Sequence, residues 1–294
     1  MNATPAEAAP RVYLDYTQAE LDRSFDQRAW VPDAEAIIAG WRDAGEQVRA
    51  VRHHWRNVPY GLDPDETLDI FFNPGCSNAP VHVHIHGGRW LLFTKDEESF
   101  IAPTFMDAGA VFVVPNFSSI ARKRLPEMVG QVQRAIAWLH ANAGRFGGNG
   151  ANLHLSGHSS GAHIAAVLLT ATWPDHLQRA QAALRSGLLV SGIYDMRPVM
   201  LSARSSYVKL AAPEVLALSP LLHIERLAAP VTIVYGERET PEFRRQSAAF
   251  AQAAGEAGKT AGLIHLPETN HFAILNGLAD AGAVLAKEAL RLML

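Results

Sequence analysis

The sequence has little of several features that mark particular classes of protein. Its 294 residues include one cysteine, Cys76, so an intramolecular disulfide is excluded, and the turn-like setting of that cysteine (73–78) does not suggest a catalytic thiol. No run approaches the roughly 20 apolar residues that a membrane-spanning helix needs. Residues 1–7 lack the basic and apolar regions of a signal peptide. We therefore expect a cytoplasmic protein with no membrane partner.

The chain also has no large excess of charge of one sign. Lys and Arg number 26 against 29 Asp and Glu, which gives a net charge of −3, and no basic block is present. Binding to nucleic acid is therefore not expected. Apolar residues, in contrast, make up 48% of the chain, and no linker or internal repeat divides it. This composition predicts a single large domain over residues 1–294 that acts on a small molecule, and it leaves the oligomeric state open.

Strand and helix patterns alternate through most of the chain. Short apolar segments that end in turns predict strands at 50–58, 68–72, 81–86, 110–115, 152–158, 187–191, 230–235 and 262–266. Only turn residues separate the first two strands, which predicts an antiparallel hairpin. Helical patterns separate most of the others, which predicts the α/β class, with a mostly parallel central sheet and helices on both faces.

Two segments lie outside this alternation. Residues 13–50 are expected to form a helical arm that Pro32 divides, with Asp33 capping its second helix. Residues 196–224 carry no strand pattern and are expected to form an irregular, partly helical cap beside the site. Either segment is placed to shape a substrate pocket.

The segment Gly157-His158-Ser159-Ser160-Gly161 has the G-x-S-x-G pattern of a nucleophile elbow. A strand precedes it and an Ala/Leu-rich helix follows, so the chain must reverse sharply at Ser159. Because that reversal brings the positions two before and two after the turn into contact, only glycine fits at both. The turn presents the Ser159 hydroxyl, and the amide of Ser160 at the helix N-terminus faces developing negative charge.

A second loop follows the strand at 81–86. Gly87 and Gly88 allow backbone amides, those of Gly88 and Arg89, to turn toward a substrate oxygen and complete an oxyanion hole with Ser160. The strand itself carries His82, His84 and His86 on one face, so a metal site is the alternative function of this region. No carboxylate or cysteine at ligand spacing accompanies them in the sequence, and no metal is expected.

Two further post-strand turns supply the partners that a serine nucleophile needs. Imidazole is a suitable base near neutral pH, and a buried carboxylate fixes its tautomer. We assign the role of base to His271 and that of the carboxylate to Glu239. The chain order of serine, acid and histidine is that of α/β-hydrolases. The competing acids are Glu237, Glu242 and Asp195.

The chain resembles the α/β-hydrolases of the arylformamidase (kynurenine formamidase) and hormone-sensitive-lipase-like esterase group. The motifs that carry the resemblance are HGGRW at 86–90, GHSSGAH at 157–163, SGIYD at 191–195, GERETPEFRRQS at 236–247 and NHF at 270–272. The resemblance implies the same triad of Ser159, Glu239 and His271 and the same oxyanion-hole residues. The sequence departs from the arylformamidase pattern in two places, with Arg89 where an aromatic is frequent and Glu239 where Asp is usual.

Three aromatic residues adjoin these loops, Trp90, Tyr194 and Phe272, and they are candidate pocket walls with core packing as the alternative. Arg89 is positioned to attract a substrate carboxylate if its side chain faces the pocket. We predict a serine hydrolase that cleaves small carboxylic esters without a cofactor. The alternatives are an arylformamidase, a ligand-binding protein on a hydrolase fold, and a metallohydrolase that uses the three histidines.

Overall fold

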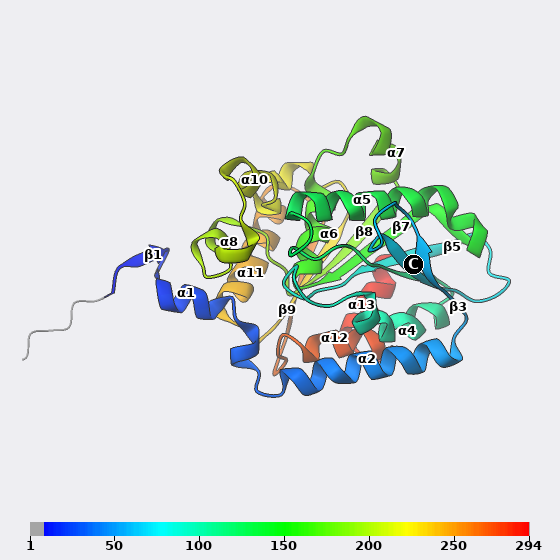
Figure 1. Ribbon diagram of the computed structural model, residues 1–294, viewed down its shortest axis with the longest axis horizontal. Coiled ribbons are helices and arrows are strands. Elements are labelled where there is room, and N and C mark those ends of the chain that lie inside the picture. The colour runs from blue at the N-terminus through cyan, green and yellow to red at the C-terminus, as the bar shows by residue number, and fades with distance from the viewer. Residues whose placement is uncertain (1–8, 294) are drawn as a thin grey trace, which may run out of the picture.

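The computed structural model describes residues 9–293 and is built around one eight-stranded sheet (Figure 1). The expectation about residues 1–7 lies outside the described residues. The strands are β3 (His54–Pro59), β4 (Thr67–Phe71), β5 (Ala79–Ile85), β6 (Val111–Pro115), β7 (Gly148–His158), β8 (Leu184–Val190), β9 (Val231–Gly236) and β10 (Ala261–Leu266). Their order across the sheet is β10-β9-β8-β7-β5-β6-β4-β3.

Strand direction in this sheet follows the prediction. β3 pairs with β4, and β4 with β6, in antiparallel register, and the remaining neighbours are parallel. The predicted opening hairpin and the mostly parallel sheet are therefore confirmed. Because the parallel strands run the same way, their carboxyl ends meet at one edge, and the loops that leave this edge lie near one another.

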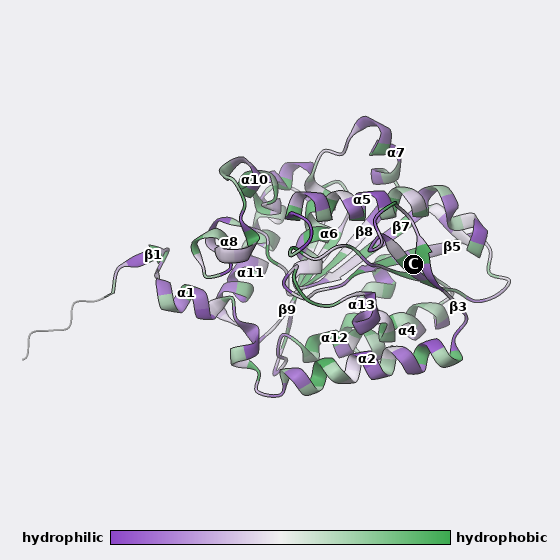
Figure 2. Ribbon diagram, viewed as in Figure 1, coloured by the Kyte–Doolittle hydropathy of each residue, from purple (hydrophilic) through white to green (hydrophobic). Residues whose placement is uncertain are grey.

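Helices cover both faces of the sheet (Figure 1). One face packs against α5 (Leu125–Asn142), α6 (Ser160–Thr170) and α11 (Pro241–Glu256), and the other against α2 (Ala34–Val51), α4 (Ala102–Asp107), α12 (Ala273–Ala279) and α13 (Val284–Met293). Successive strand residues point to opposite faces, so Leu189 joins the first core and Leu188 the second. The amphipathic stripe of α2 is visible in Figure 2 as alternating hydrophobic and hydrophilic turns.

The N-terminal arm differs from the prediction at its start. Residues 13–17 are not helical; β1 (Arg11–Tyr13) and β2 (Tyr16–Thr17) form a small antiparallel hairpin, and α1 (Gln18–Ser24) follows. Thr17 and Glu20 form a capping box that fixes the start of α1. The side chain of Asp33 makes no cap hydrogen bond to α2. That helix continues to Val51, so the first strand of the large sheet begins later than expected.

The remaining elements are short. They are α3 (Lys95–Glu98), α7 (Gln178–Gln181), α8 (Arg197–Leu201), α9 (Ser205–Val208), α10 (Ala212–Ala217) and 3₁₀ segments at Gln27–Trp30, Ser99–Ile101, Ala143–Phe146, Asp175–Leu177 and Pro220–Arg226. Residues 196–224 thus form the expected irregular, partly helical excursion. No helix of residues 9–293 is long and apolar enough to cross a bilayer.

Candidate active site

The turn between β7 and α6 places Ser159 in a strained conformation. Its φ of 55° and ψ of −118° are unusual for a residue with a side chain. The flanking glycines make this turn sterically possible: a Cβ at Gly157 would lie 2.5 Å from the carbonyl carbon of Gly161, and one at Gly161 would lie 2.0 Å from the carbonyl oxygen of Ile85. The prediction that only glycine fits at both positions is confirmed.

Three loops at the carboxyl edge of the sheet bring an alcohol, an imidazole and a carboxylate together. His271 Nε2 lies 3.0 Å from Ser159 Oγ, and His271 Nδ1 lies 3.0 Å from Glu239 Oε2. All three side chains are buried. In this order of contacts the serine hydroxyl can donate to the imidazole, while the opposite ring nitrogen donates to the carboxylate. The arrangement is that of a serine nucleophile with a general base and an orienting acid.

The carboxylate of Glu239 is held on both oxygens. Oε1 accepts hydrogen bonds from the Ser191 hydroxyl at 2.6 Å and from the Gly236 amide at 2.7 Å, while Oε2 faces His271. Burial alone would raise the pKa of Glu239, but the bonds from His271, Gly236 and Ser191 outweigh it, and the pKa lies below its ordinary value. The group is therefore ionised near neutral pH and able to stabilise a protonated imidazole.

The three competing acids are engaged elsewhere. Glu237 is exposed and accepts from the Glu268 amide. Glu242 pairs with Arg245 on its own helix, and Asp195 pairs with Arg197. Only Glu239 among the four candidates contacts His271 in the hydrogen bonds of the described residues.

A residue not singled out by the sequence holds the loop of His271. His158, immediately before Ser159, places its Nε2 2.8 Å from the carbonyl oxygen of His271. Because a carbonyl only accepts, this nitrogen carries the proton. Burial, with help from the neighbouring His271, lowers the pKa of His158 to about 4, so the ring is neutral at neutral pH.

The loop after β5 has a backbone suited to binding an oxyanion. Gly88, Arg89 and Trp90 all have positive φ values, of 102°, 59° and 60°. In residues 9–293 the amides of Gly88 and Arg89 have no hydrogen-bond acceptor, whereas Trp90 N donates to Ser160 Oγ at 3.1 Å and thereby ties this loop to the elbow. The amide of Ser160, in the first turn of α6, has no acceptor within its helix. These three amides are the predicted oxyanion-hole donors.

The two histidines of β5, and His86 directly after it, are buried beneath this loop. His82 Nε2 and His84 Nδ1 lie 2.7 and 2.6 Å from Ser156 Oγ, and His86 Nδ1 lies 3.0 Å from the Gly87 carbonyl. In the part of the chain that the structure describes, no group of three His, Cys, Asp or Glu is arranged to hold a metal.

Glu98 is a buried carboxylate that sequence spacing did not reveal. Its Oε2 lies 2.7 Å from His84 Nε2, and its Oε1 accepts from the Gly87 amide at 2.9 Å. Burial would raise the pKa of Glu98, but the bond with His84 and the other nearby imidazoles lower it overall. The sequence offered no carboxylate at ligand spacing from these histidines, and Glu98 reaches His84 only because α3 folds back toward β5. Glu98 thereby holds the start of the loop after β5.

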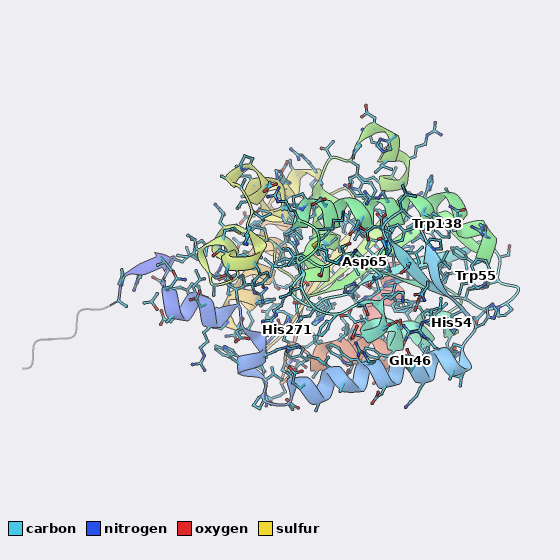
Figure 3. The ribbon with its side chains drawn as sticks, viewed as in Figure 1. Glu46, His54, Trp55, Asp65, Trp138 and His271 are labelled. Atoms are coloured by element: carbon cyan, nitrogen blue, oxygen red, sulfur yellow. The ribbon has the colours of Figure 1, made fainter. Side chains whose placement is uncertain are left out.

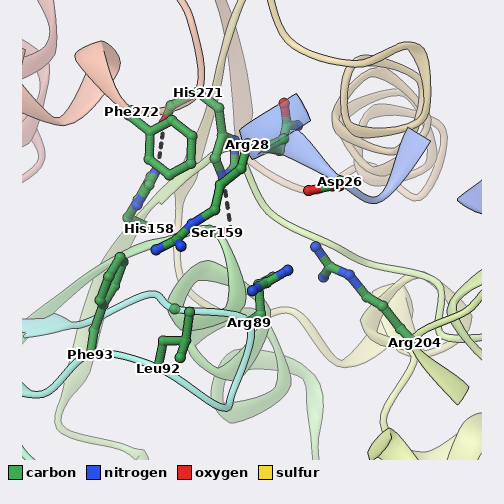
Figure 4. Close-up of a pocket in the computed structure, with 12 residues that line it drawn as sticks. Asp26, Arg28, Arg89, Leu92, Phe93, His158, Ser159, Arg204, His271 and Phe272 are labelled. Carbon is green, nitrogen blue, oxygen red and sulfur yellow. Dashed lines mark hydrogen bonds between the residues drawn. The ribbon is translucent and has the colours of Figure 1, made fainter. Parts of the chain in front are cut away.

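A narrow pocket opens in front of Ser159 (Figure 4). Its volume is about 30 Å³, and its lining residues come from the arm, the loop after β5, the elbow, the 196–224 excursion and the His271 loop. Phe272 lines it as expected. Trp90 and Tyr194 do not, which corrects the expectation for both. The Trp90 indole is buried beneath the loop with Nε1 3.2 Å from His163 Nδ1, and Tyr194 is stacked on Phe250.

Figure 3 places His271 at the arm side of the molecule, well away from His54, Trp55 and Trp138 at the other end of the sheet. The residues that sequence reasoning missed at the pocket are Asp26, Gln27, Arg28, Leu92, Phe93 and Arg204. They lie in segments whose position depends on tertiary packing. For Asp26, Gln27, Arg28 and Arg204 the only signal was the general expectation that the arm and the excursion border the site. Leu92 and Phe93 belong to the loop after β5, whose first residues were predicted to lie at the site.

Comparison with known proteins agrees with this geometry. The family model described as BD-FAE matches residues 68–187, a span that includes the loop after β5 and Ser159 and ends before Glu239 and His271. A kynurenine formamidase from Danio rerio is 29% identical over 286 residues, covering 93% of this chain and 96% of that protein. Esterase LipQ from Mycobacterium tuberculosis is 28% identical, covering 83% of this chain and 66% of that protein.

A solved structure extends the similarity to nearly the whole fold. The crystal structure of a putative thioesterase from Silicibacter sp. TM1040 superposes with a TM-score of 0.81 at 25% identity. The match covers 93% of this chain and 98% of the other. The similarity therefore extends well beyond the residues that the family model matches.

Proposed function

We propose that this chain, which belongs to the α/β-hydrolase superfamily, is a serine hydrolase that cleaves small carboxylic esters through an acyl-enzyme. The observation that carries the proposal is the hydrogen-bonded sequence from Ser159 through His271 to Glu239. A serine hydroxyl alone is a weak nucleophile, and a base within hydrogen-bond reach corrects this. The strained turn and the unpaired amides beside it support the same function.

In the first half-reaction, Ser159 Oγ attacks the ester carbonyl carbon while its proton passes to His271 Nε2. The negative charge that develops on the carbonyl oxygen is stabilised by the amides of Gly88, Arg89 and Ser160. The C–O bond to the leaving group then breaks, and His271 returns the proton to the departing alkoxide. Glu239 stabilises the imidazolium that exists between these two transfers.

In the second half-reaction, a water molecule takes the position that the alcohol has left. His271 removes a proton from this water as its oxygen attacks the acyl carbonyl. The bond to Ser159 Oγ breaks, the serine recovers its proton from the imidazolium, and a carboxylic acid is released. Ser159 gives its proton to His271 in the first half-reaction and receives one from it in the second, so the same groups serve both steps and no further residue is required.

A second candidate substrate class is the aryl formamide. It is favoured by the kynurenine formamidase relative, whose match extends over 96% of that protein. Formamide cleavage uses the same attack on a carbonyl, with an amine in place of an alcohol as the leaving group. His271 is positioned to protonate either one.

The proposal is tested first by a fluorophosphonate probe and by Ser159→Ala. We expect the probe to label Ser159 in the folded wild-type protein and ester turnover to fall about 10³-fold or more in the variant. Absent labelling and absent turnover would favour a non-catalytic binding protein. Activity that survives Ser159→Ala and is lost to a chelator would instead favour a metallohydrolase.

The two substrate classes are separated by comparing kcat/KM for p-nitrophenyl acetate and for N-formylkynurenine. Faster ester cleavage supports the proposal as stated. Negligible ester turnover beside fast formamide cleavage would replace it with the second candidate. Glu239 and His271 keep their proposed roles in both cases.

A further inference from the structure

Arg204 is a buried guanidinium at the pocket that the proposed chemistry does not use. It precedes α9, is 6% exposed, and lines the pocket with Ser159 and His271. Its guanidinium lies 5.3 Å from the ring centre of Phe25 and 5.9 Å from those of Trp90 and Phe243. Nη2 donates to the Phe25 carbonyl, while Nη1 is buried with no hydrogen-bond partner. An orphaned donor on a buried cation is costly unless something else satisfies it.

A comparable buried arginine, Arg49, is fully paired with carboxylates. Arg49, 7% exposed, bonds to the carboxylates of Asp69 and Asp96 and to the Ser99 hydroxyl. Among residues 9–293, Arg204 has no carboxylate within 4.0 Å. Burial lowers the pKa of Arg204 to about 10, so the charge is still present at neutral pH. The protein thus carries a persistent buried cation at its pocket that forms no ion pair among residues 9–293, and Asp26 acts on it only from beyond 4.0 Å.

A second guanidinium shares this setting. Arg89 lines the same pocket, and in Figure 4 the side chains of Arg89 and Arg204 both reach toward the space beside Ser159. Arg28, the third arginine of the lining, is paired with Glu35 at 2.7 Å. Asp26 is the one acid of the lining and forms no ion pair among the described residues. Two unpaired cations therefore face one carboxylate, which leaves the pocket positively charged.

These arginines also border a larger neighbouring cavity. That cavity, of about 360 Å³, is lined by three arginines and two acids (Arg23, Arg89, Arg204, Asp22 and Asp26) together with Phe25, Ala203 and Tyr207. The inner pocket, at about 30 Å³, has room for roughly two water molecules. A short acyl group fits the inner space, and the rest of a substrate must extend past the arginines into the outer one.

We propose that Arg204 and Arg89 form a carboxylate-binding subsite, so that the preferred substrates carry a short acyl group and a carboxylate on the departing part. This inference rests on the proposed hydrolase function. A planar guanidinium with a free donor matches a carboxylate oxygen, and exclusion of water strengthens the contact. In this subsite the substrate carboxylate supplies the hydrogen-bond acceptor that Nη1 of Arg204 lacks.

The test is a matched pair of acetate esters, 4-acetoxybenzoate and 4-acetoxybenzamide. The two have the same acyl group and nearly the same shape, and they differ in the charge of the distal group. We expect the wild-type protein to cleave the carboxylate with a kcat/KM roughly 10- to 100-fold higher than the amide, the range of a charge-assisted hydrogen bond. Equal values, or a preference for the amide, would overturn the subsite.

Variants then assign the preference to residues through the ratio of the two kcat/KM values. Arg204→Met is expected to bring the ratio close to one, and Arg204→Lys to leave an intermediate ratio because the charge remains without the planar fork. Arg291→Met is the control, since this exposed arginine lies on α13 and pairs with Glu288. It should leave the ratio at the wild-type value. A ratio that is unchanged in Arg204→Met would contradict the proposal.

Arg204→Met removes a bond to the Phe25 carbonyl, so its folding is checked by thermal unfolding. If it does not fold, the ratio of the two kcat/KM values is measured in Arg89→Met instead. Inhibition of the wild-type protein gives an independent test that needs no variant. Benzoate is expected to inhibit with a Ki at least tenfold below that of benzamide; equal Ki values would count against the subsite. Failure of the hydrolase function is distinguishable, because it abolishes fluorophosphonate labelling and the turnover of both esters.

Discussion

His158 and His271 are joined by a hydrogen bond from the imidazole of the first to the main-chain carbonyl of the second, with 2.8 Å between nitrogen and oxygen. The residue before the proposed nucleophile therefore holds the loop that carries the proposed base. The two rings also lie close, with 4.8 Å between their centres. The separation of Ser159 from His271 thus depends on a side chain that takes no part in proton transfer.

The first prediction concerns this positioning bond. His158→Leu is expected to lower kcat about 10- to 100-fold with little change in KM, since small misplacement of a base is costly. His140→Leu is the matched control, because His140 makes a similar bond to the Gly150 carbonyl outside the pocket. Steady-state kinetics on both variants check this. A kcat that falls equally in the two would assign the effect to stability.

The second prediction separates Glu239 from its neighbour in the same loop. Glu239→Gln is expected to lower kcat by about 10³- to 10⁴-fold, because an amide neither fixes the tautomer of His271 nor stabilises its protonated form. Glu237→Gln, at an exposed position, should retain activity within about twofold. If Glu237→Gln were the more damaging change, the orienting acid would have to be reassigned.

The third prediction concerns the close contact of the elbow with β5. Gly161→Ala is expected to lower the free energy of unfolding by about 3 kcal/mol, because the added methyl meets the Ile85 carbonyl, which belongs to a central strand and cannot move away. Gly255→Ala in α11 is the control, with nothing within 4 Å of the added carbon. It should raise stability by roughly 0.5 to 1 kcal/mol. Urea unfolding of the two variants gives both values, and equal effects would refute the steric argument.

The fourth prediction follows from the buried histidines. Burial lowers the pKa of His163 to about 4, against an ordinary value of 6.5 in the unfolded chain. Between these values the unfolded state binds a proton that the folded state does not, so the free energy of unfolding falls as the pH falls from 6.5 to 4. In His163→Gln this dependence should be flatter by up to about 1.4 kcal/mol per pH unit.

Urea unfolding at several pH values measures this slope. The stability difference between wild type and His163→Gln at pH 8 gives the packing cost of the substitution, since both states of the histidine are then neutral. A difference that stays constant down to pH 4 would mean that His163 takes up its proton in the folded state as well.

The sheet and the elbow were predictable because their signals are local. Strands of β-branched residues end in turns, and the strain of the elbow appears in the sequence as Gly157 and Gly161. Parallel strand direction then places the loops of Ser159, Glu239 and His271 at one edge, and the structure brings these side chains within hydrogen-bond distance. The choice of Glu239 over Glu237 depended on a two-residue difference in position within one loop.

Other parts of the site depend on packing that no local pattern records. Trp90 adjoins the oxyanion loop, but three successive positive φ values turn its side chain under the elbow to His163. Glu98 reaches His84 because α3 folds back over β5. Arg204 lies in an excursion with no strand pattern, so its approach to the pocket follows only from the assembled fold.

The pocket draws its walls from both extremes of the described chain, with Gln27 near one end and His271 near the other. During synthesis, Ser159 therefore emerges from the ribosome about 110 residues before its base, a span fixed by the spacing of the two positions. An incomplete nascent chain holds the serine without a proton acceptor. In the proposed mechanism, acylation must therefore await translation of β10 and the loop that follows it.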